Sequence, residues 1–148
     1  MRALLQRVKS AHVRVEDREV GHIGPGWLVL LGVGRGDSLA QAQSLAEKVV
    51  HLRAFADEAG KMNRSGLDVG AEVLVVSQFT LYADLRRGRR PYFGDAAPPE
   101  LASELVGAFT ATVAHFGLRT ASGEFGAMME VGLIGDGPVT LWLDSDHL

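Results

Sequence analysis

Polar side chains interrupt an apolar stretch at positions 77 to 81, where the sequence reads Ser-Gln-Phe-Thr-Leu. Buried polar groups cost free energy unless they are hydrogen-bonded, so a core strand seldom carries them without a reason. Two interpretations stay open: a polar site built into the strand, or a strand that emerges at the end of its sheet. In a regular strand, period two would place Gln78 and Thr80 on one face, and Ser77 and Phe79 on the other.

A second candidate segment, Asp136-Gly-Pro-Val-Thr140, is expected to lie between two strands. Its composition is typical of a turn, and most such turns have no further role. The functional alternative is that Gly137 and Pro138 present backbone carbonyls to a ligand. A cis X-Pro bond costs only about 0.5–1 kcal/mol, so a cis bond at Pro138 is energetically accessible.

Three other patterns argue in turn against a bound dinucleotide, a metal site and a serine nucleophile. The segment Gly32-Val-Gly-Arg-Gly-Asp37 follows a strand, but the third glycine of a dinucleotide fingerprint would fall at Asp37, and we expect no βαβ unit there. The five histidines have no ligand-like spacing. Ser77 lacks the flanking glycines of a nucleophile elbow, so we do not expect a serine-hydrolase triad of that kind. We therefore expect neither a metal site nor a cofactor.

Two helices and several strands must position these segments. Ser38 and Gln41 form a predicted capping box for a first helix that continues to Leu52, and Pro98-Pro-Glu100 opens a second helix. Strands are expected at 4–15, 27–33, 72–82, 118–122, 128–134 and 139–143. The strands dominate and show no regular βαβ alternation. We therefore predict an α+β fold with a mainly antiparallel sheet and two main helices, in one domain over 1–148.

Composition favours a soluble globular protein. The 148 residues are 47% hydrophobic and 22% charged, and charged residues interrupt the N-terminal segment before a signal peptide could form. The longest apolar run, residues 27–33, is far shorter than the roughly 20 residues of a membrane span. Cysteine is absent, which fits a reducing compartment. We expect a cytoplasmic protein without membrane contact.

Charge is unevenly distributed along the chain. The formal net charge of −3 argues against a general nucleic-acid coat protein. Four of the 15 basic residues nevertheless fall within five positions, at Arg86, Arg87, Arg89 and Arg90. This cluster indicates either a local phosphate-binding patch or a solvated loop.

The two motifs resemble those of the D-aminoacyl-tRNA deacylases, also called D-tyrosyl-tRNA deacylases. The hallmark segments of that family correspond to 77–81 and to Gly-Pro-Val-Thr at 137–140. The resemblance extends, in the same order, over Leu5-Gln-Arg-Val8, 28–33, 61–63, 73–76 and Phe125-Gly-Ala127. One departure is Gly135, where the family usually has asparagine two residues before the glycine of its second motif.

The resemblance implies a compact α+β domain with a barrel-like sheet, active as a homodimer with active sites at the interface. The first motif of one subunit would supply the catalytic residues Ser77, Gln78, Phe79 and Thr80. Gly137 and cis-Pro138 of the other subunit would form a chirality filter whose carbonyls capture the substrate amino group and exclude L side chains. The implied reaction hydrolyses the ester bond of D-aminoacyl-tRNA, and of mischarged glycyl-tRNA, releasing amino acid and tRNA.

Ester hydrolysis chiefly needs stabilisation of the oxyanion that forms when water attacks. The backbone N–H groups of Phe79 and Thr80 are candidate donors, and one such donor is typically worth about 3–4 kcal/mol. The Thr80 hydroxyl would position water or the ester. A covalent threonine nucleophile, or assistance by the 2′-OH of the terminal adenosine, are the alternatives.

Other residues are expected to support the site. Arg7 would lock the orientation of the glycine–proline element, unless it is an ordinary strand arginine. Phe125 would line the adenosine pocket at the tRNA 3′ end, or pack in the core. The arginine cluster would bind acceptor-stem phosphates.

Two rival functions remain open. The first is a related deacylase of L- or misacylated tRNA whose chirality filter is relaxed because Pro138 is trans, which the departure at Gly135 allows. The second is a nonenzymatic tRNA-binding module that uses the arginine cluster alone. Ester hydrolysis distinguishes the second from the first.

Overall fold

The first strand, β1 (Arg2–Val15), is long enough to serve two parts of the sheet. Its first half pairs antiparallel with β3 (Gly26–Gly32) and its second half with β2 (Arg18–Ile23), while β8 (Glu130–Asp144) runs along its other edge. From β3 the sheet continues in parallel through β6 (Glu72–Ser77) to β7 (Thr120–Ser122). The computed structural model, which describes residues 1–148, therefore contains a six-stranded sheet of order β2-β1-β3-β6-β7 with β8 beside β1.

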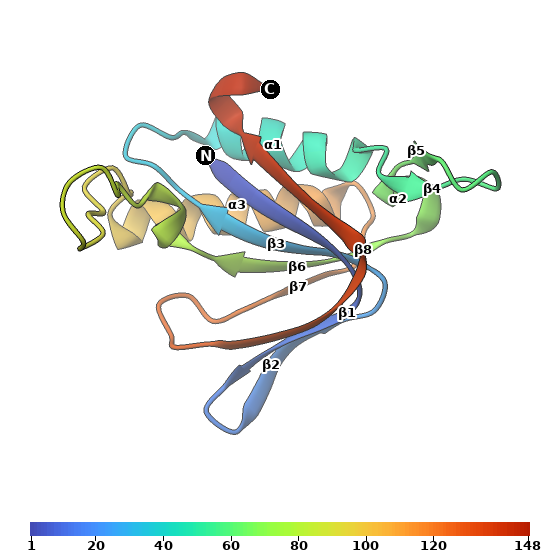
Figure 1. Ribbon diagram of the computed structural model, residues 1–148, viewed down its shortest axis with the longest axis horizontal. Helices are drawn as coiled ribbons and strands as arrows, with labels where there is room; N and C mark the ends of the chain where they lie inside the picture. The colour runs from blue at the N-terminus through green and yellow to red at the C-terminus, as the bar shows by residue number, and fades with distance from the viewer.

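The sheet curls until its two ends approach each other (Figure 1). A Cβ atom on Gly21 of β2 would lie only 2.6 Å from the carbonyl oxygen of Ser122 in β7, so glycine permits this close approach. The sheet is nearly closed into a barrel. The expected compact α+β fold with a barrel-like sheet is thus confirmed, with three antiparallel and two parallel pairings.

Two long helices cover one face of the sheet (Figure 1). They are α1 (Leu39–His51) and α3 (Pro99–His115), and both match the predicted helices. The capping box is present, because the Ser38 amide donates to Gln41 Oε1 at 2.8 Å. Shorter elements complete the chain: α2 (Gly66–Val69), the hairpin β4 (Phe55–Ala56) and β5 (Met62–Arg64), and the 3₁₀ turns η1 (Phe79–Tyr82) and η2 (Ser145–His147). None of the helices is both long and apolar enough to cross a membrane.

Alternation of side chains along the central strands creates two apolar cores. One face of β3 and β6 packs against the helices. The larger core lies there and includes Trp27, Val29 and Val75 of the sheet and Phe109 of α3. The opposite face points into the curled sheet, where Leu28 and Leu74 meet residues of β1 and β2. Strands β3 and β6 are therefore apolar on both faces, which explains why their sequences lack a polar–apolar alternation.

Two expectations about this region are wrong. The strand predicted over 72–82 ends at Ser77, because β3 leaves the sheet after Gly32 and residues beyond Ser77 have no neighbouring strand to pair with. A βαβ unit does follow Gly32, since β3 and β6 are parallel neighbours connected through α1. The β4–β5 hairpin and α2 lie between α1 and β6 in the chain, so the sequence shows no regular alternation of strand, helix and strand.

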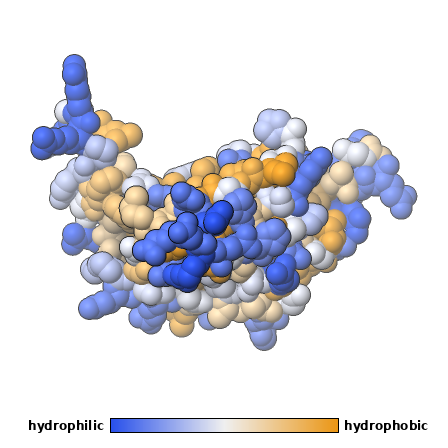
Figure 2. All heavy atoms as spheres, turned by 90° about the horizontal axis from the view of Figure 1, so that it is seen from below, coloured by the Kyte–Doolittle hydropathy of each residue, from blue (hydrophilic) through white to orange (hydrophobic).

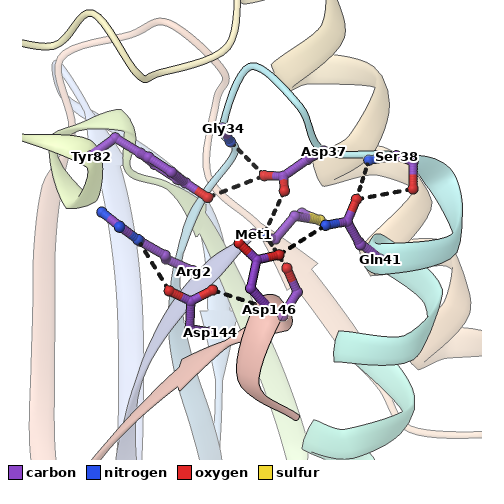
Figure 3. A network of polar contacts seen from close by, with 10 residues as sticks. Met1, Arg2, Gly34, Asp37, Ser38, Gln41, Tyr82, Asp144 and Asp146 are labelled. Carbon is purple, nitrogen blue, oxygen red and sulfur yellow. Dashed lines mark hydrogen bonds and ion pairs between the residues drawn. The ribbon is translucent and has the colours of Figure 1, made fainter.

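Asp37, at the end of the glycine-rich turn after β3, binds groups of this chain (Figure 3). Its carboxylate accepts hydrogen bonds from the Gly34 amide at 2.5 Å and the Tyr82 hydroxyl at 3.2 Å, and it contacts the Met1 amino group at 2.6 Å. Arg2 pairs with Asp144 and stacks on the Tyr82 ring at 4.3 Å. These contacts hold η1 against the chain ends, so they fix the element that carries the first motif.

Burial and the neighbouring Asp37 carboxylate raise the pKa of Tyr82 above its ordinary value of 10.0. Folding therefore favours the neutral phenol, and this contribution is complete below about pH 10 and is lost as pH rises through the raised value. We expect the stability advantage of the wild-type protein over Tyr82→Phe to shrink between about pH 8 and pH 11. Urea unfolding at both pH values measures it; an advantage that grows with pH would contradict this assignment.

Candidate active site

The first motif lies where β6 ends and η1 begins. The Gln78 amide donates the last bond of the sheet to the Leu31 carbonyl at 2.8 Å, and the first bond of η1 runs from the Leu81 amide to the Gln78 carbonyl at 3.3 Å. The amides of Phe79 and Thr80 lie between these two bonds, at the start of a helical turn, where N–H groups lack an intrahelical partner. Ser77 and Gln78 are half-buried and the next two residues are exposed, so the strand emerges at the sheet end.

The Thr80 hydroxyl is oriented by its neighbour. Gln78 Nε2 donates a hydrogen bond to Thr80 Oγ1 at 2.5 Å. Because an acceptor position of the hydroxyl is filled in this way, its proton is free to point toward a water or an ester oxygen. The motif thus exposes two backbone N–H donors and one oriented hydroxyl within two residues.

The second motif forms a bulge inside one long strand and is not the turn between two strands that the sequence predicted. In the pairing of β1 with β8, Gln6 is opposite Thr140 and Val8 is opposite Gly135, so residues 136–139 of β8 face the single residue Arg7. Pro138 has no N–H for the sheet, and Gly137 has a φ of +151°, which side chains disfavour. Both residues are exposed, and the peptide bond between them is cis.

Arg7 holds this bulge in place. Its Nε donates to the Asp136 carbonyl at 3.0 Å, and its Nη1 donates to the Ala54 carbonyl at 2.5 Å. The Asp136 carboxylate lies 3.3 Å from the same Nε. The Arg7 side chain is only 13% exposed, so these bonds form in a poorly hydrated environment where they are stronger than at the surface. The structure therefore places Arg7 directly against the glycine–proline segment.

The two motifs do not meet within one chain. Arg7, beside the bulge, is paired with Trp27, which is paired with Val73 near the start of β6. The first motif begins at Ser77, which is four residues further along β6, or about 13 Å at the usual rise per residue. Figure 1 shows β8 bending at the end of the sheet opposite to that toward which β6 points.

The arginine cluster lies on a loop attached to the first motif. Two hydrogen bonds close the base of the loop, from the Asp84 amide to the Tyr92 carbonyl at 2.7 Å and back at 3.0 Å. The ring of Phe93 contacts the ring of Phe79 edge-on, with centroids 4.9 Å apart. The projection on the left of Figure 2, on the side where Figure 1 shows this loop, is largely hydrophilic. The exposed cluster is thus coupled to η1 through two aromatic rings.

The arginines of the cluster are not equivalent. Arg86 forms a two-pronged ion pair with Asp84, with both N···O distances 2.8 Å. These bonds, with one from the Arg86 amide, lower the pKa of Asp84 to about 2. The pair is therefore intact at neutral pH and is lost only as pH falls toward that value. Arg87, Arg89 and Arg90 form no ion pair within the chain.

Phe125 lies on the loop between β7 and β8 and is 42% exposed, so it is not a core residue. Because β7 runs parallel to β6, this loop leaves the sheet at the end where the first motif lies.

Two interactions near the site were not predicted from the sequence. The Thr140 hydroxyl donates a hydrogen bond to Gln6 Oε1 at 2.6 Å, and Asp84 forms the ion pair with Arg86. An acidic residue two positions before an arginine run was the available signal for Asp84.

Comparison with known proteins assigns the chain to a family. A family model described as D-Tyr-tRNA(Tyr) deacylase matches residues 4–144. A D-aminoacyl-tRNA deacylase of Roseiflexus sp. (strain RS-1) is 61% identical over 145 residues, covering 98% of this chain and 94% of the relative. The chain belongs to the D-aminoacyl-tRNA deacylase family. A family member from Thermomicrobium roseum is 59% identical over 148 residues, covering 100% of this chain and 96% of that protein.

Solved structures agree with the deacylase fold. One described as a c-Myc DNA Unwinding Element Binding Protein is 37% identical with a TM-score of 0.90, covering 97% of this chain and 98% of that one. Another, described as a probable eukaryotic D-amino acid tRNA deacylase, has a TM-score of 0.85 at 17% identity, which supports the fold alone. The resemblance seen in the sequence is thus confirmed: the protein is a hydrolase that acts on the ester bond of D-aminoacyl-tRNA.

Proposed function

We propose that the protein works as a homodimer in which each active site combines η1 of one subunit with the glycine–proline bulge of the other. The observation that carries this proposal is the placement of two exposed motifs at opposite ends of one sheet. A single chain cannot bring them to one ester. A two-fold dimer can, and it does so twice, because the same contacts are repeated by symmetry.

The edge of β8 supports association with a second copy. This 15-residue strand pairs with β1 on one side only. It exposes several large apolar side chains, namely Val131, Leu133, Ile134 and Trp142. A long apolar edge strand is a site of uncontrolled pairing unless something covers it. A second copy placed against β8 would bury this edge and bring its own bulge close to the interface.

Within each site, main-chain groups perform most of the chemistry. The amides of Phe79 and Thr80 would stabilise the oxyanion formed when water attacks the ester carbonyl. Thr80, held by Gln78, would orient the water or the ester, and the tRNA 2′-OH can assist as a proton carrier. Ser77 would support the turn. The sites need no ionisable side chain as a nucleophile, because the aminoacyl ester is already an activated acyl group.

Chirality would be read by the bulge. The carbonyls of Gly137 and Pro138 would accept hydrogen bonds from the substrate amino group, leaving room for hydrogen but not for an L side chain. Main-chain atoms give a filter that is independent of the D side chain, so many D-aminoacyl-tRNAs and glycyl-tRNA would be accepted. Gly135 does not favour the relaxed rival, because the bulge is braced by Arg7 through the Asp136 carbonyl.

The RNA would lie along the first-motif end of the sheet. Phe125 would line the pocket of the terminal adenosine, and the free arginines of the loop would contact backbone phosphates. Both elements lie at the end of the sheet where η1 begins. The arginine loop contacts η1 through Phe79 and Phe93, so RNA bound to the loop would lie beside the reacting turn.

Mixing two inactive variants tests the shared site. In a heterodimer of Gly137→Ala and Phe79→Pro, one site carries both changes and the other carries neither. Random exchange makes about half of the dimers heterodimers, each with one intact site, so about a quarter of wild-type activity should return. Each variant alone serves as the control, and light scattering verifies the dimer. A mixture no more active than its components would exclude a site built from two subunits.

A further inference from the structure

A pocket of about 730 Å³ lies beside the first motif, lined by Asp84, Arg86, Arg87 and Tyr92. Its volume is within the range of small-molecule sites, roughly 300–1,000 Å³. The two backbone hydrogen bonds between Asp84 and Tyr92 fix its base. The pocket therefore belongs to a loop whose two ends are joined by hydrogen bonds, and the side chains of Arg86, Arg87 and Tyr92 line it from exposed positions.

The charge in this pocket is divided between two arginines. The Asp84 carboxylate neutralises Arg86 and holds its guanidinium by two bonds of 2.8 Å. Arg87 lines the same pocket and has no acidic partner. Arg86 thus shapes the wall, whereas Arg87 leaves a positive charge that suits a phosphate.

Tyr92 supplies an aromatic surface in the same pocket. The side chain is 68% exposed. A Cβ on Gly94 would lie 2.3 Å from the Tyr92 ring, so the ring rests against the Gly94 backbone. A ring supported on one side and exposed on the other is the arrangement on which bases of single-stranded nucleic acid stack.

We propose that this pocket binds a nucleotide that precedes the terminal adenosine of the aminoacylated RNA, with its phosphate on Arg87 and its base on Tyr92. The inference rests on the proposed function for the identity of the RNA. The Phe93–Phe79 contact places the nucleotide next to the η1 turn, where the ester would react. Arg86 is a positioning residue that holds the loop and does not itself bind RNA.

Two substrates separate this pocket from the reacting centre: D-tyrosyl-tRNA and 3′-O-D-tyrosyl-adenosine, which lacks every preceding nucleotide. Tyr92→Ala should lower the ratio of kcat/KM for the tRNA to kcat/KM for the adenosine ester about tenfold, through KM. Tyr92→Phe, which keeps the ring, should restore the ratio. Arg87→Ala should lower it similarly and reduce the salt slope of tRNA binding by about one. Lys48→Ala on α1 is the control for loss of one exposed positive charge.

Binding of uncharged tRNA, followed by fluorescence anisotropy, keeps the two proposals separate. Weaker binding by Tyr92→Ala, with rescue by Tyr92→Phe, supports the pocket even if the wild-type protein were to hydrolyse no D-aminoacyl ester, a result that would overturn the proposed function alone. A Tyr92→Ala variant that binds tRNA as tightly as wild type overturns the pocket. Equal loss on both substrates overturns it too, because the ring would then act at the reacting centre or on the fold.

Discussion

Replacing Gly137 by alanine is expected to slow hydrolysis of D-tyrosyl-tRNA by at least about 100-fold while the protein remains folded. A Cβ at this position would lie 2.4 Å from the Val139 amide nitrogen and 2.9 Å from its Cγ2, and φ is +151°. The backbone of the bulge must therefore move. A displacement of about 1 Å in a group that positions the substrate is enough to cost 100-fold.

Gly135 provides a matched control on the same strand. A Cβ there would meet no atom within 4 Å, and its φ is not positive, so Gly135→Ala should retain near wild-type activity. Single-turnover rates on D-tyrosyl-tRNA measure both variants, and thermal unfolding verifies their folding.

Thr80→Ala should reduce the rate of D-tyrosyl-tRNA hydrolysis less than Gly137→Ala does, because the backbone donors of the first motif stay in place. Equal and complete loss in Thr80→Ala would instead favour a threonine nucleophile.

Replacing Phe79 by proline should lower kcat about 100- to 1,000-fold beyond the effect of Phe79→Ala, because proline removes an oxyanion donor. Both changes delete the ring, so their difference isolates the N–H group. Phe79 is the first residue of η1, where proline fits, and Gln78 has φ −144° and ψ 79°, outside the helical region disfavoured before proline.

One outcome of comparing Phe79→Pro with Phe79→Ala would contradict the proposed role of the Phe79 amide. If Phe79→Pro and Phe79→Ala react at the same rate, the amide of Phe79 does not stabilise the oxyanion. Circular dichroism and the melting temperature of each variant establish that η1 and the sheet persist. The Thr80 amide would remain the only backbone donor of the motif in that case.

Local sequence patterns, such as caps and apolar periodicity, were sufficient to predict the two long helices and most strands. The Ser38–Gln41 capping box and the prolines before Glu100 mark helix starts that the structure confirms. Local patterns failed where the pairing of distant strands decides where an element ends. The apolar pattern continues past Ser77, yet the strand stops there because β3 has already turned away.

The candidate site, too, could be predicted in part from residue types and in part only from the tertiary structure. Residue types alone indicated that 77–81 and 136–140 were unusual, and the structure locates Arg7 and the arginine loop beside them. Their placement at opposite ends of one sheet follows from the register of β1, β3 and β6, which no local pattern reveals. The ion pair of Asp84 with Arg86 likewise depends on side-chain geometry.

We propose that the protein hydrolyses D-aminoacyl-tRNA without a metal ion and discriminates between substrates by their chirality. The most direct test measures release of tyrosine from matched D- and L-tyrosyl-tRNA by the purified protein in EDTA. We predict rapid release from the D substrate, with the L substrate stable over the same time. Comparable release from both would contradict the chirality filter and favour the relaxed deacylase, and release from neither would contradict the proposed reaction itself.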